Sequence, residues 1–316
     1  MRLSKRLRLL AVAVVFTAST AAIAAPNFIN ILTGGTSGVY YPIGVGLSQF
    51  YSGIDGAKVS VQATKASVEN LNLLQSGRGE LALALGDSVA DAWNGVEDAG
   101  FKVPLRKLRA IAGTYPNYIQ IVASKESGIT TLADLKGKRF SVGAPKSGTE
   151  LNARAIFKAA GLRYEDMGKL EYLPYAESVE LIKNRQLDAT LQSSGLGMAA
   201  IRDLAATLPI RFIPIPAEIT AAIGNAAYQP AVIPAGTYDG QDTDVVTVAI
   251  KNILVSHAGV SDELAYQMTK LMFENLERLG YAHSAAKEIK LDGAASKLPI
   301  PLHPGAERFY KEVGAL

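Results

Sequence analysis

The sequence predicts an α/β protein built from two similar lobes that are joined by two crossing strands. Short β-rich runs alternate with amphipathic helical stretches through most of the chain, which is typical of parallel sheets covered by helices. The alternation forms two units, and each unit opens with a strand, a glycine-rich turn and a helix. The chain passes from one unit to the other near residue 120 and returns near residue 248. Two lobes linked in this way are expected to close over a cleft like a clamp.

The first unit is expected to contain three strand–helix pairs. The hydrophobic periodicity predicts strands at residues 28–33, 59–63 and 81–85, and helices at residues 40–51, 68–76 and 88–94. A further strand at residues 118–123 leads out of this unit.

The second unit is expected to repeat this arrangement before the chain returns. Its predicted strands are 139–142, 170–173, 187–191 and 211–215, and its predicted helices are 148–160, 176–185 and 196–206. The Pro- and Gly-rich stretch 228–244 is expected to be a loop, 245–256 a strand, and 262–279 and 305–313 helices. These limits divide the chain into lobe one (residues 25–122 and 246–316) and lobe two (residues 123–245).

Matching motifs support the similarity of the two units. The turn at residues 32–38 (LTGGTSG) corresponds to residues 142–148 (VGAPKSG), and the tripeptide Ser-Val-Glu opens the second helix of each unit at Ser67 and Ser178. Such short matches arise by chance, so the evidence for two similar units is that the matches occupy equivalent places in them. In such a pair of lobes the cleft is expected where the carboxyl ends of the two sheets face each other.

The N-terminal segment has the features of a secretory signal peptide. Four basic residues and no acid occupy the first eight positions, an apolar run follows at residues 9–18, and the segment ends in Ala22-Ile23-Ala24. We predict that residues 1–24 are the signal peptide, that cleavage follows Ala24, and that the mature protein is periplasmic. An uncleaved membrane anchor is the alternative, although the apolar run is short for a membrane span.

Composition excludes several classes of partner and chemistry. The chain has 32 Lys and Arg residues against 29 Asp and Glu residues, and loss of the four basic residues of the signal peptide leaves 28 against 29. No nucleic-acid partner is therefore indicated. The absence of cysteine excludes disulfides, thiolate chemistry and a lipidated N-terminal Cys. We expect a monomer that is free in the periplasm and does not span the membrane.

The glycine-rich turn before the first helix is a candidate anion site. Gly34, Gly35 and Gly38 permit positive φ and allow a ligand to approach the backbone closely. Pro42 suits a first helical turn, and the free N–H groups there, with the positive end of the helix dipole, favour an anion. The alternative is a tight strand-to-helix turn with no ligand. The turn lacks the Gly-Lys-Ser/Thr ending of a P-loop.

The matching helix of the second unit predicts a second anion site. Ser147 at the N-cap and Glu150 three residues later have the pattern of a capping box, which stabilises a helix by about 1 kcal/mol without any ligand. Thr149 and the first N–H groups nevertheless stay available to an oxyanion. Two helix starts that face each other, one from each lobe, are the arrangement that a carboxylate clamp requires.

Other polar residues are expected on the rim of the cleft. Lys65 and Lys146 lie in corresponding loops, and they are either solvated surface lysines or counter-charges for a second carboxylate. Ser193 and Ser194 follow the matching strand of lobe two, and Asp87 is interpreted as an ordinary helix cap.

Catalytic and metal-binding patterns are missing from the sequence. His257, His283 and His303 are isolated and lack metal-ligand spacing, and no Gly-x-Ser-x-Gly elbow is present. We expect a protein that is not an enzyme and that needs neither a metal nor a cofactor.

Four motifs in order resemble the TAXI type of TRAP-transporter solute receptors. They are LTGGTSGVYYPIG (residues 32–44), SVENL (67–71), VGAPKSGTE (142–150) and IPAGTY (233–238), and the resemblance covers essentially the whole mature chain. It implies a type II periplasmic-binding-protein fold and delivery of the ligand to a TRAP-type membrane permease driven by an ion gradient. It also implies a small carboxylate as ligand, either an amino acid such as glutamate or a dicarboxylate such as 2-oxoglutarate.

The resemblance assigns the ligand-facing groups by position, from both lobes: Gly35, Thr36, Gly38, Tyr40, Ser67, Ser147, Gly148, Thr149 and Glu150. The family often has glycines before Ser67 and Ser147, whereas this chain has Lys65-Ala66 and Lys146, so Lys65 and Lys146 join the candidate site. Recognition of an amino acid requires an acid facing the ammonium. Because the capping box would occupy Glu150, we expect a dicarboxylate rather than an amino acid.

Two functions of other classes stay open. The same fold would serve a periplasmic sensor that signals through a membrane kinase, and a neighbouring permease gene would favour transport instead. An exported two-lobed enzyme is the other alternative, although the sequence shows no nucleophile–base pair.

Overall fold

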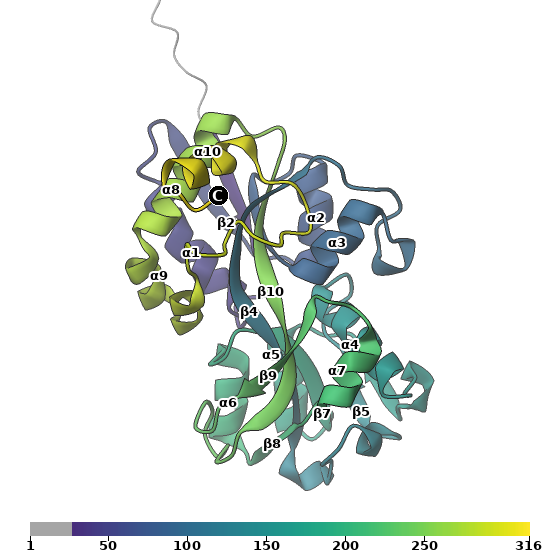
Figure 1. The fold of residues 1–316 in the computed structure, drawn as a ribbon. Coiled ribbons are helices and arrows are strands. Elements are labelled where there is room, and N and C mark those ends of the chain that lie inside the picture. The colour runs from purple at the N-terminus through teal and green to yellow at the C-terminus, as the bar shows by residue number, and fades with distance from the viewer. Residues whose placement is uncertain (1–26) are drawn as a thin grey trace, which may run out of the picture.

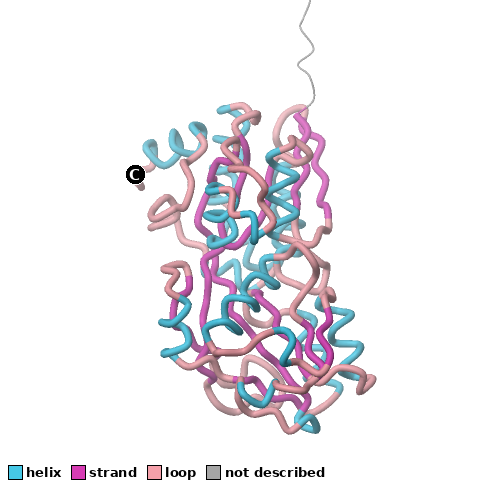
Figure 2. The backbone as a smooth tube through the Cα atoms, turned by 90° about the vertical axis from the view of Figure 1, so that its right-hand side faces the viewer, coloured by secondary structure: helices cyan, strands magenta, loops and turns pink. Residues whose placement is uncertain are grey.

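The computed structural model describes residues 27–316, which fold into two α/β lobes joined by two long strands (Figure 1). The predicted signal peptide, with its cleavage site after Ala24, lies outside the described residues. β4 (Leu108–Ser124) and β10 (Val245–His257) pair in antiparallel fashion and run from one lobe into the other. The side view in Figure 2 shows strands continuing between the lobes with helices beside them in each lobe. The predicted two-lobed α/β fold is confirmed.

Lobe one lies uppermost in Figure 1. Its strands are β1 (Asn27–Leu32), β2 (Ala57–Gln62) and β3 (Leu81–Leu85), and its first helices are α1 (Tyr40–Tyr51), α2 (Ser67–Gln75) and α3 (Gly86–Asn94). β1 is parallel to β2 and β3, and β3 pairs antiparallel with β10. After β10 the chain adds α8 (Asp262–Glu274), α9 (Leu276–Ala282) and α10 (Pro304–Glu312) to this lobe.

Lobe two is built around the other ends of the same two long strands. It contains β5 (Arg139–Ser141), β6 (Lys169–Glu171), β7 (Ala189–Ser194), β8 (Ile210–Ile213), β9 (Tyr228–Ile233), α4 (Gly148–Ala159), α5 (Tyr175–Lys183), α6 (Ala199–Thr207) and α7 (Ala217–Ile223). β7 and β8 pair antiparallel with β4, β9 pairs antiparallel with β10, and β5 is parallel to β6 and β7. Short 3₁₀ helices lie at Glu97–Ala99, Lys125–Ser127, Ala133–Leu135, Tyr164–Asp166 and Ser284–Glu288.

Apolar patterning explains how these elements pack. β3 reads Leu-Ala-Leu-Ala-Leu and is buried along its whole length, as expected for a strand covered on both faces. Leu47 and Tyr51 of α1 join Ile31 of β1 in the core of lobe one, and Phe140 and Phe157 pack with ring centroids 5.3 Å apart in lobe two. No helix within residues 27–316 is both long enough and apolar enough to cross a membrane.

Four elements differ from the sequence prediction. The first is α7, which lies in a stretch where no element is predicted. β4 begins ten residues before the predicted strand at 118, because the ladder with β10 absorbs Gly113 and Pro116 through a register shift between Lys251 and Ile253. Residues 228–233, predicted as a loop, form β9, since Pro230 is tolerated in a strand that pairs on one side with β10. The predicted helix 262–279 is divided at Asn275, whose side-chain Nδ2 donates a 2.8 Å hydrogen bond to the carbonyl of Leu271.

Candidate functional site

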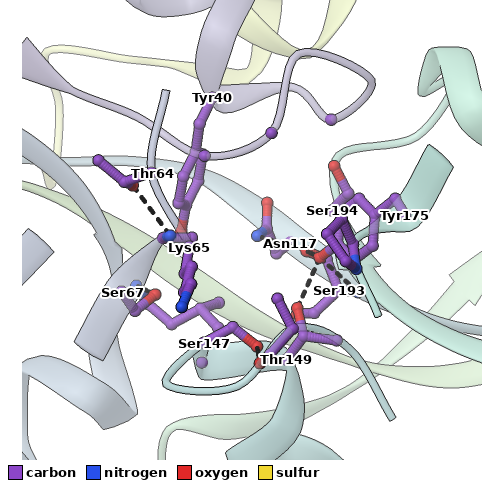
Figure 3. A pocket seen from close by; sticks show the side chains of 18 of the residues that line it. Tyr40, Thr64, Lys65, Ser67, Asn117, Ser147, Thr149, Tyr175, Ser193 and Ser194 are labelled. Carbon is purple, nitrogen blue, oxygen red and sulfur yellow. Dashed lines mark hydrogen bonds between the residues drawn. The ribbon is translucent and has the colours of Figure 1, made fainter. Parts of the chain in front are cut away.

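A cavity of about 140 Å³ lies between the two lobes, and both lobes contribute to its wall (Figure 3). The wall combines the turn before α1, the start of α2, the end of β3, one residue of β4, and the starts of α4 and α5 with the end of β7. Its nineteen residues are Gly34, Gly35, Gly38, Val39, Tyr40, Thr64, Lys65, Ala66, Ser67, Leu85, Asn117, Ala144, Ser147, Gly148, Thr149, Pro174, Tyr175, Ser193 and Ser194.

The cavity gathers most of the residues that the sequence proposes as a site. Eight of the eleven predicted residues line it: Gly35, Gly38, Tyr40, Lys65, Ser67, Ser147, Gly148 and Thr149. Thr36, Lys146 and Glu150 do not line it. The two glycine-rich turns of the sequence therefore meet at one place, as their equivalent positions in the two units predict.

Glu150 points away from the cavity, contrary to its predicted place there. Its Oε1 accepts hydrogen bonds from Arg154 Nε at 2.7 Å and from the hydroxyl of Tyr164 at 3.0 Å, and the side chain is buried. Only half of the predicted capping box forms, because Ser147 Oγ accepts from the Glu150 N–H at 3.2 Å while the Glu150 carboxylate faces Arg154. Glu150 is therefore not placed to meet a ligand ammonium.

Lys146 contributes its backbone rather than its side chain to the region between the lobes. Its side chain is exposed and lies off the cavity wall, whereas its carbonyl accepts a 3.3 Å hydrogen bond from the N–H of Glu69 in lobe one. Thr36 is also exposed and off the wall. The predicted symmetric pair of lysines is reduced to Lys65.

The residues just before Ser67 and Ser147 share an unusual backbone conformation. Ala66 has a φ of 70° and Lys146 a φ of 62°, a region that glycine occupies without steric cost. Non-glycine residues in such conformations store strain of about 1–3 kcal/mol. By contrast, Gly34, Gly35 and Gly38 do not have positive φ, so the turn does not use the conformational freedom that these glycines permit.

The glycines of the turn before α1 matter for the space they leave. A Cβ at Gly38 would lie 3.4 Å from the ring of Tyr175, and a Cβ at Gly34 would lie 3.4 Å from the Cβ of Ala66. Both are ordinary contact distances, so a methyl group would just fill the space between the turn, the start of α2 and the opposite lobe.

Helix starts from both lobes converge on the cavity wall. Within residues 27–316 no protein group accepts a hydrogen bond from the N–H of Gly148 or Thr149, the first residues of α4. Ser67, at the start of α2, accepts a 3.1 Å hydrogen bond from the N–H of Leu85 through its Oγ, and this hydroxyl lies beside that of Tyr40. Unpaired N–H groups at a helix start, together with the helix dipole, favour an anion.

The lobes touch each other in this structure, so the cleft is closed. A Cβ at Gly148 would lie 2.7 Å from both Ser67 Oγ and Leu85 Cδ1 of the opposite lobe. Ser194 Oγ accepts a 3.3 Å hydrogen bond from the N–H of Val39 across the same gap. The absence of a side chain at Gly148 thus permits closure.

Tyr175 and Asn117 are wall residues that the sequence analysis missed. The Tyr175 hydroxyl lies 2.6 Å from Thr149 Oγ1, donates to the carbonyl of Ser193 at 2.7 Å and accepts from its N–H at 3.1 Å. Burial raises the pKa of Tyr175 to about 12, so it stays protonated. Asn117 Nδ2 donates to the same carbonyl at 3.1 Å. Pro174 before Tyr175 marks a helix start, whereas nothing in the local sequence singles out Asn117.

A second polar cluster joins the lobes next to the cavity. Asp87 of α3 accepts hydrogen bonds through Oδ2 from Asn152 Nδ2 at 2.8 Å and from the Tyr228 hydroxyl at 2.7 Å. Its Oδ1 accepts from the N–H of the next residue, Ser88, at 2.7 Å. Asp87 lies inside α3, whose N-cap is Leu85 with no side-chain cap, so the predicted cap is wrong and Asp87 binds lobe two instead.

The three histidines serve local turns. Nδ1 of His257, His283 and His303 accepts from the N–H of Gly259, Ala285 and Gly305 respectively, at 3.1–3.2 Å. None of them lines the cavity. In the described part of the chain no three His, Asp or Glu side chains gather where they would hold a metal ion.

Solved structures with the same fold share little sequence with this chain. A protein of Bordetella bronchiseptica RB50 is 14% identical with a TM-score of 0.58, and the match covers 91% of this chain and 98% of that one. A periplasmic transporter is 12% identical with a TM-score of 0.58, covering 91% and 93%. The binding-protein component of an ABC phosphonate transporter from Pseudomonas aeruginosa is 12% identical with a TM-score of 0.54, covering 84% and 80%.

These likenesses confirm a two-lobed periplasmic-binding-protein fold. The family model that matches extends over residues 31–314, nearly the whole described chain. It does not specify the TAXI type that the four motifs resemble. By this match the chain belongs to the NMT1-like family.

Proposed function

We propose that this protein is a periplasmic solute-binding protein that captures a small carboxylate between its lobes and delivers it to a membrane permease. The observation that carries the proposal is the convergence of helix starts from both lobes on one cavity, where the N–H groups of Gly148 and Thr149 have no protein acceptor within residues 27–316. Such groups bind an oxyanion without a metal or a cationic side chain. The closed contact between Gly148 and Ser67 fits capture by closure.

Binding without turnover fits the composition of the cavity wall. Among the described residues, the wall holds no His, Cys, Asp or Glu, so no imidazole, thiolate or carboxylate base stands beside Ser67, Ser193 or Ser194. We therefore propose that the ligand leaves the protein chemically unchanged.

The permease is proposed to be of the TRAP class, on the strength of the four ordered motifs. The Pseudomonas aeruginosa relative belongs to an ABC transporter, which makes an ATP-driven permease the second candidate. Uptake of labelled ligand into vesicles that hold the neighbouring permease separates the two. A TRAP partner responds to collapse of the ion gradient, and an ABC partner responds to loss of ATP. A neighbouring histidine kinase without a permease would favour the sensor instead.

Each of the two predicted ligand classes loses one of the protein groups proposed to bind it. Glutamate loses its proposed ammonium partner, because Glu150 is engaged by Arg154 and Tyr164. A dicarboxylate such as 2-oxoglutarate loses one of its two proposed counter-charges, because Lys146 lies off the wall while Lys65 lines it.

Ligand binding is tested by thermal unfolding with a panel of organic acids and amino acids. A bound acid at one hundred times its Kd stabilises the protein by about 2.7 kcal/mol. Mass spectrometry of the small molecules that co-purify with the protein identifies the natural ligand. The absence of any shift across carboxylates, with a shift for an uncharged or cationic solute, would reject the carboxylate proposal.

A further inference from the structure

The cavity has two chemically different ends. Lys65 and Ser67 lie at one side of the cavity in Figure 3, and Tyr175 and Ser193 lie at the opposite side. Each end restricts the ligand in its own way.

The first end suits one anionic group. Lys65 is the one Lys, Arg or His among the nineteen wall residues of the described chain. The Ser67 hydroxyl lies against Gly148 at the start of α4, and the N–H groups of Gly148 and Thr149 have no protein acceptor within residues 27–316. These groups together provide donors for both oxygens of one carboxylate.

No acidic group of the wall is placed to face an ammonium. The wall contains no Asp or Glu, and of the four acids within two residues of a wall residue, Glu177 is exposed and lies off the wall while the other three are engaged. Glu150 binds Arg154, Glu69 accepts a 2.6 Å hydrogen bond from the N–H of Lys65, and Asp87 binds Asn152 and Tyr228. An ammonium buried here would lack a counter-charge, which is strongly unfavourable.

The second end is polar but uncharged. Ser193 is only 4% exposed, and its Oγ has no hydrogen-bond partner within residues 27–316. The neighbouring Tyr175 hydroxyl and Asn117 amide are held by the backbone of Ser193. Buried hydroxyls nearly always have a partner. The Oγ itself is shielded from solvent, so an oxygen on the ligand would supply the partner after the Ser193 hydroxyl turns into the cavity, whereas a carboxylate there would meet no cation of the wall.

We infer that the ligand is a small monocarboxylic acid that carries an oxo or hydroxyl group and no ammonium. The inference rests on the proposed carboxylate-binding function and narrows its substrate class. The carboxylate lies at the starts of α2 and α4 below Lys65, and the uncharged oxygen pairs with Ser193.

Matched acids test each part of this inference by isothermal titration calorimetry on the purified mature protein. The sets are built on three-, four- and five-carbon chains, for example 2-oxobutyrate, 2-hydroxybutyrate, butyrate and 2-aminobutyrate, with 2-oxoglutarate as the dicarboxylate. The best oxo or hydroxy monocarboxylate is expected to bind at least about tenfold more tightly than the amino, unsubstituted and dicarboxylate forms. Ser193→Ala should abolish the preference for the oxo or hydroxy acid over the unsubstituted acid. Ser178→Ala, a buried serine of α5 outside the cavity, should keep it.

Three results would overturn the inference. Equal or tighter binding of the amino acid or the dicarboxylate would reject the charge assignment while retaining the proposed function. Equal binding of the unsubstituted acid, or an unchanged preference in Ser193→Ala, would reject the assignment of Ser193. If none of the monocarboxylates binds, the inference falls, and the proposed function falls with it only if every other carboxylate in the wider panel also fails to bind.

Discussion

The carboxylate of Asp87 in lobe one accepts a 2.7 Å hydrogen bond from the hydroxyl of Tyr228 in lobe two. Asn152 donates to the same oxygen, so three side chains hold the lobes together beside the cavity. Asp87 is 3% exposed. Burial raises the pKa of Asp87 from an ordinary 3.8 to about 6, and the negative charge of Asp91 also raises this pKa. We therefore expect closure of the cleft to be coupled to uptake of a proton by Asp87.

Ligand affinity is expected to rise as the pH falls from about 7.5 to about 5.5. An open cleft returns Asp87 to water and its pKa towards 3.8, whereas the closed cleft holds the pKa near 6. Above pH 6 closure buries a charge, and as the pH falls through 6 the closed form takes up a proton and becomes favoured. These two pKa values predict about fourfold tighter binding at the lower pH, measurable by calorimetry with a carboxylate that stays ionised.

Two neutral variants check that Asp87 is responsible. Asp87→Asn should flatten the pH dependence of affinity between these limits, because the titrating group is gone. Asp91→Asn removes an acid of the same helix that makes no hydrogen bond across the lobes, and it should leave most of the dependence. A slope that persists in Asp87→Asn would show that another group controls closure.

Gly148→Ala is expected to weaken ligand binding without unfolding either lobe. The added methyl would lie 2.7 Å from Ser67 Oγ and Leu85 Cδ1, so closure would require the opposite lobe to shift. Overpacking of this kind costs about 1–3 kcal/mol, which corresponds to roughly a five- to 150-fold loss of affinity. Small-angle scattering with saturating ligand should show a more open protein than the wild type.

Gly35→Ala is the matched control for closure. Gly35 also lines the cavity, yet a Cβ there has no neighbour within 4 Å. A single methyl at this position should leave closure intact, and a larger side chain such as leucine should reduce binding by filling ligand space. Equal losses for Gly35→Ala and Gly148→Ala would contradict the specific role of Gly148.

Ala66→Gly is expected to stabilise the folded protein. Ala66 has φ 70° and ψ −145°, a combination that glycine adopts readily and alanine does not. Glycine relieves the strain but also gives the unfolded chain more entropy. The net gain in the free energy of unfolding is expected to be about 1 kcal/mol. Urea unfolding of the unliganded protein measures it. Ala160→Gly, at a position with φ −83°, should lower the stability instead, and a stability loss in Ala66→Gly would exclude strain at that residue.

The sequence predicts local elements better than it predicts which side chains face the cavity. Helix α1 and strand β3 have the predicted limits, because their apolar spacing and flanking turns are local signals. Asn117 and Tyr175 join the site through the pairing of β4 with β7 and through the packing of α5, which depend on residues far away in the chain. The resemblance assigns Glu150 to the cavity by its position in the motif, whereas its orientation is decided by Arg154 and Tyr164. The residue limits of the two lobes stay a prediction, since β4 and β10 run through both without interruption.

Lys65→Ala and Lys146→Ala separate the two lysines that the sequence treats as a pair. Lys65 lines the cavity and Lys146 does not, although both side chains are exposed. Loss of an exposed cation beside a bound carboxylate costs about 0.2–1 kcal/mol, so Lys65→Ala should weaken binding by roughly 1.5- to fivefold. This loss should shrink in high salt, because the remaining interaction of the anion is with backbone N–H groups that are screened less. Calorimetry at low and high ionic strength measures both effects. Lys146→Ala should leave the affinity within error of the wild type. An equal loss of affinity in both variants would instead support the interpretation that both lysines are counter-charges for the ligand.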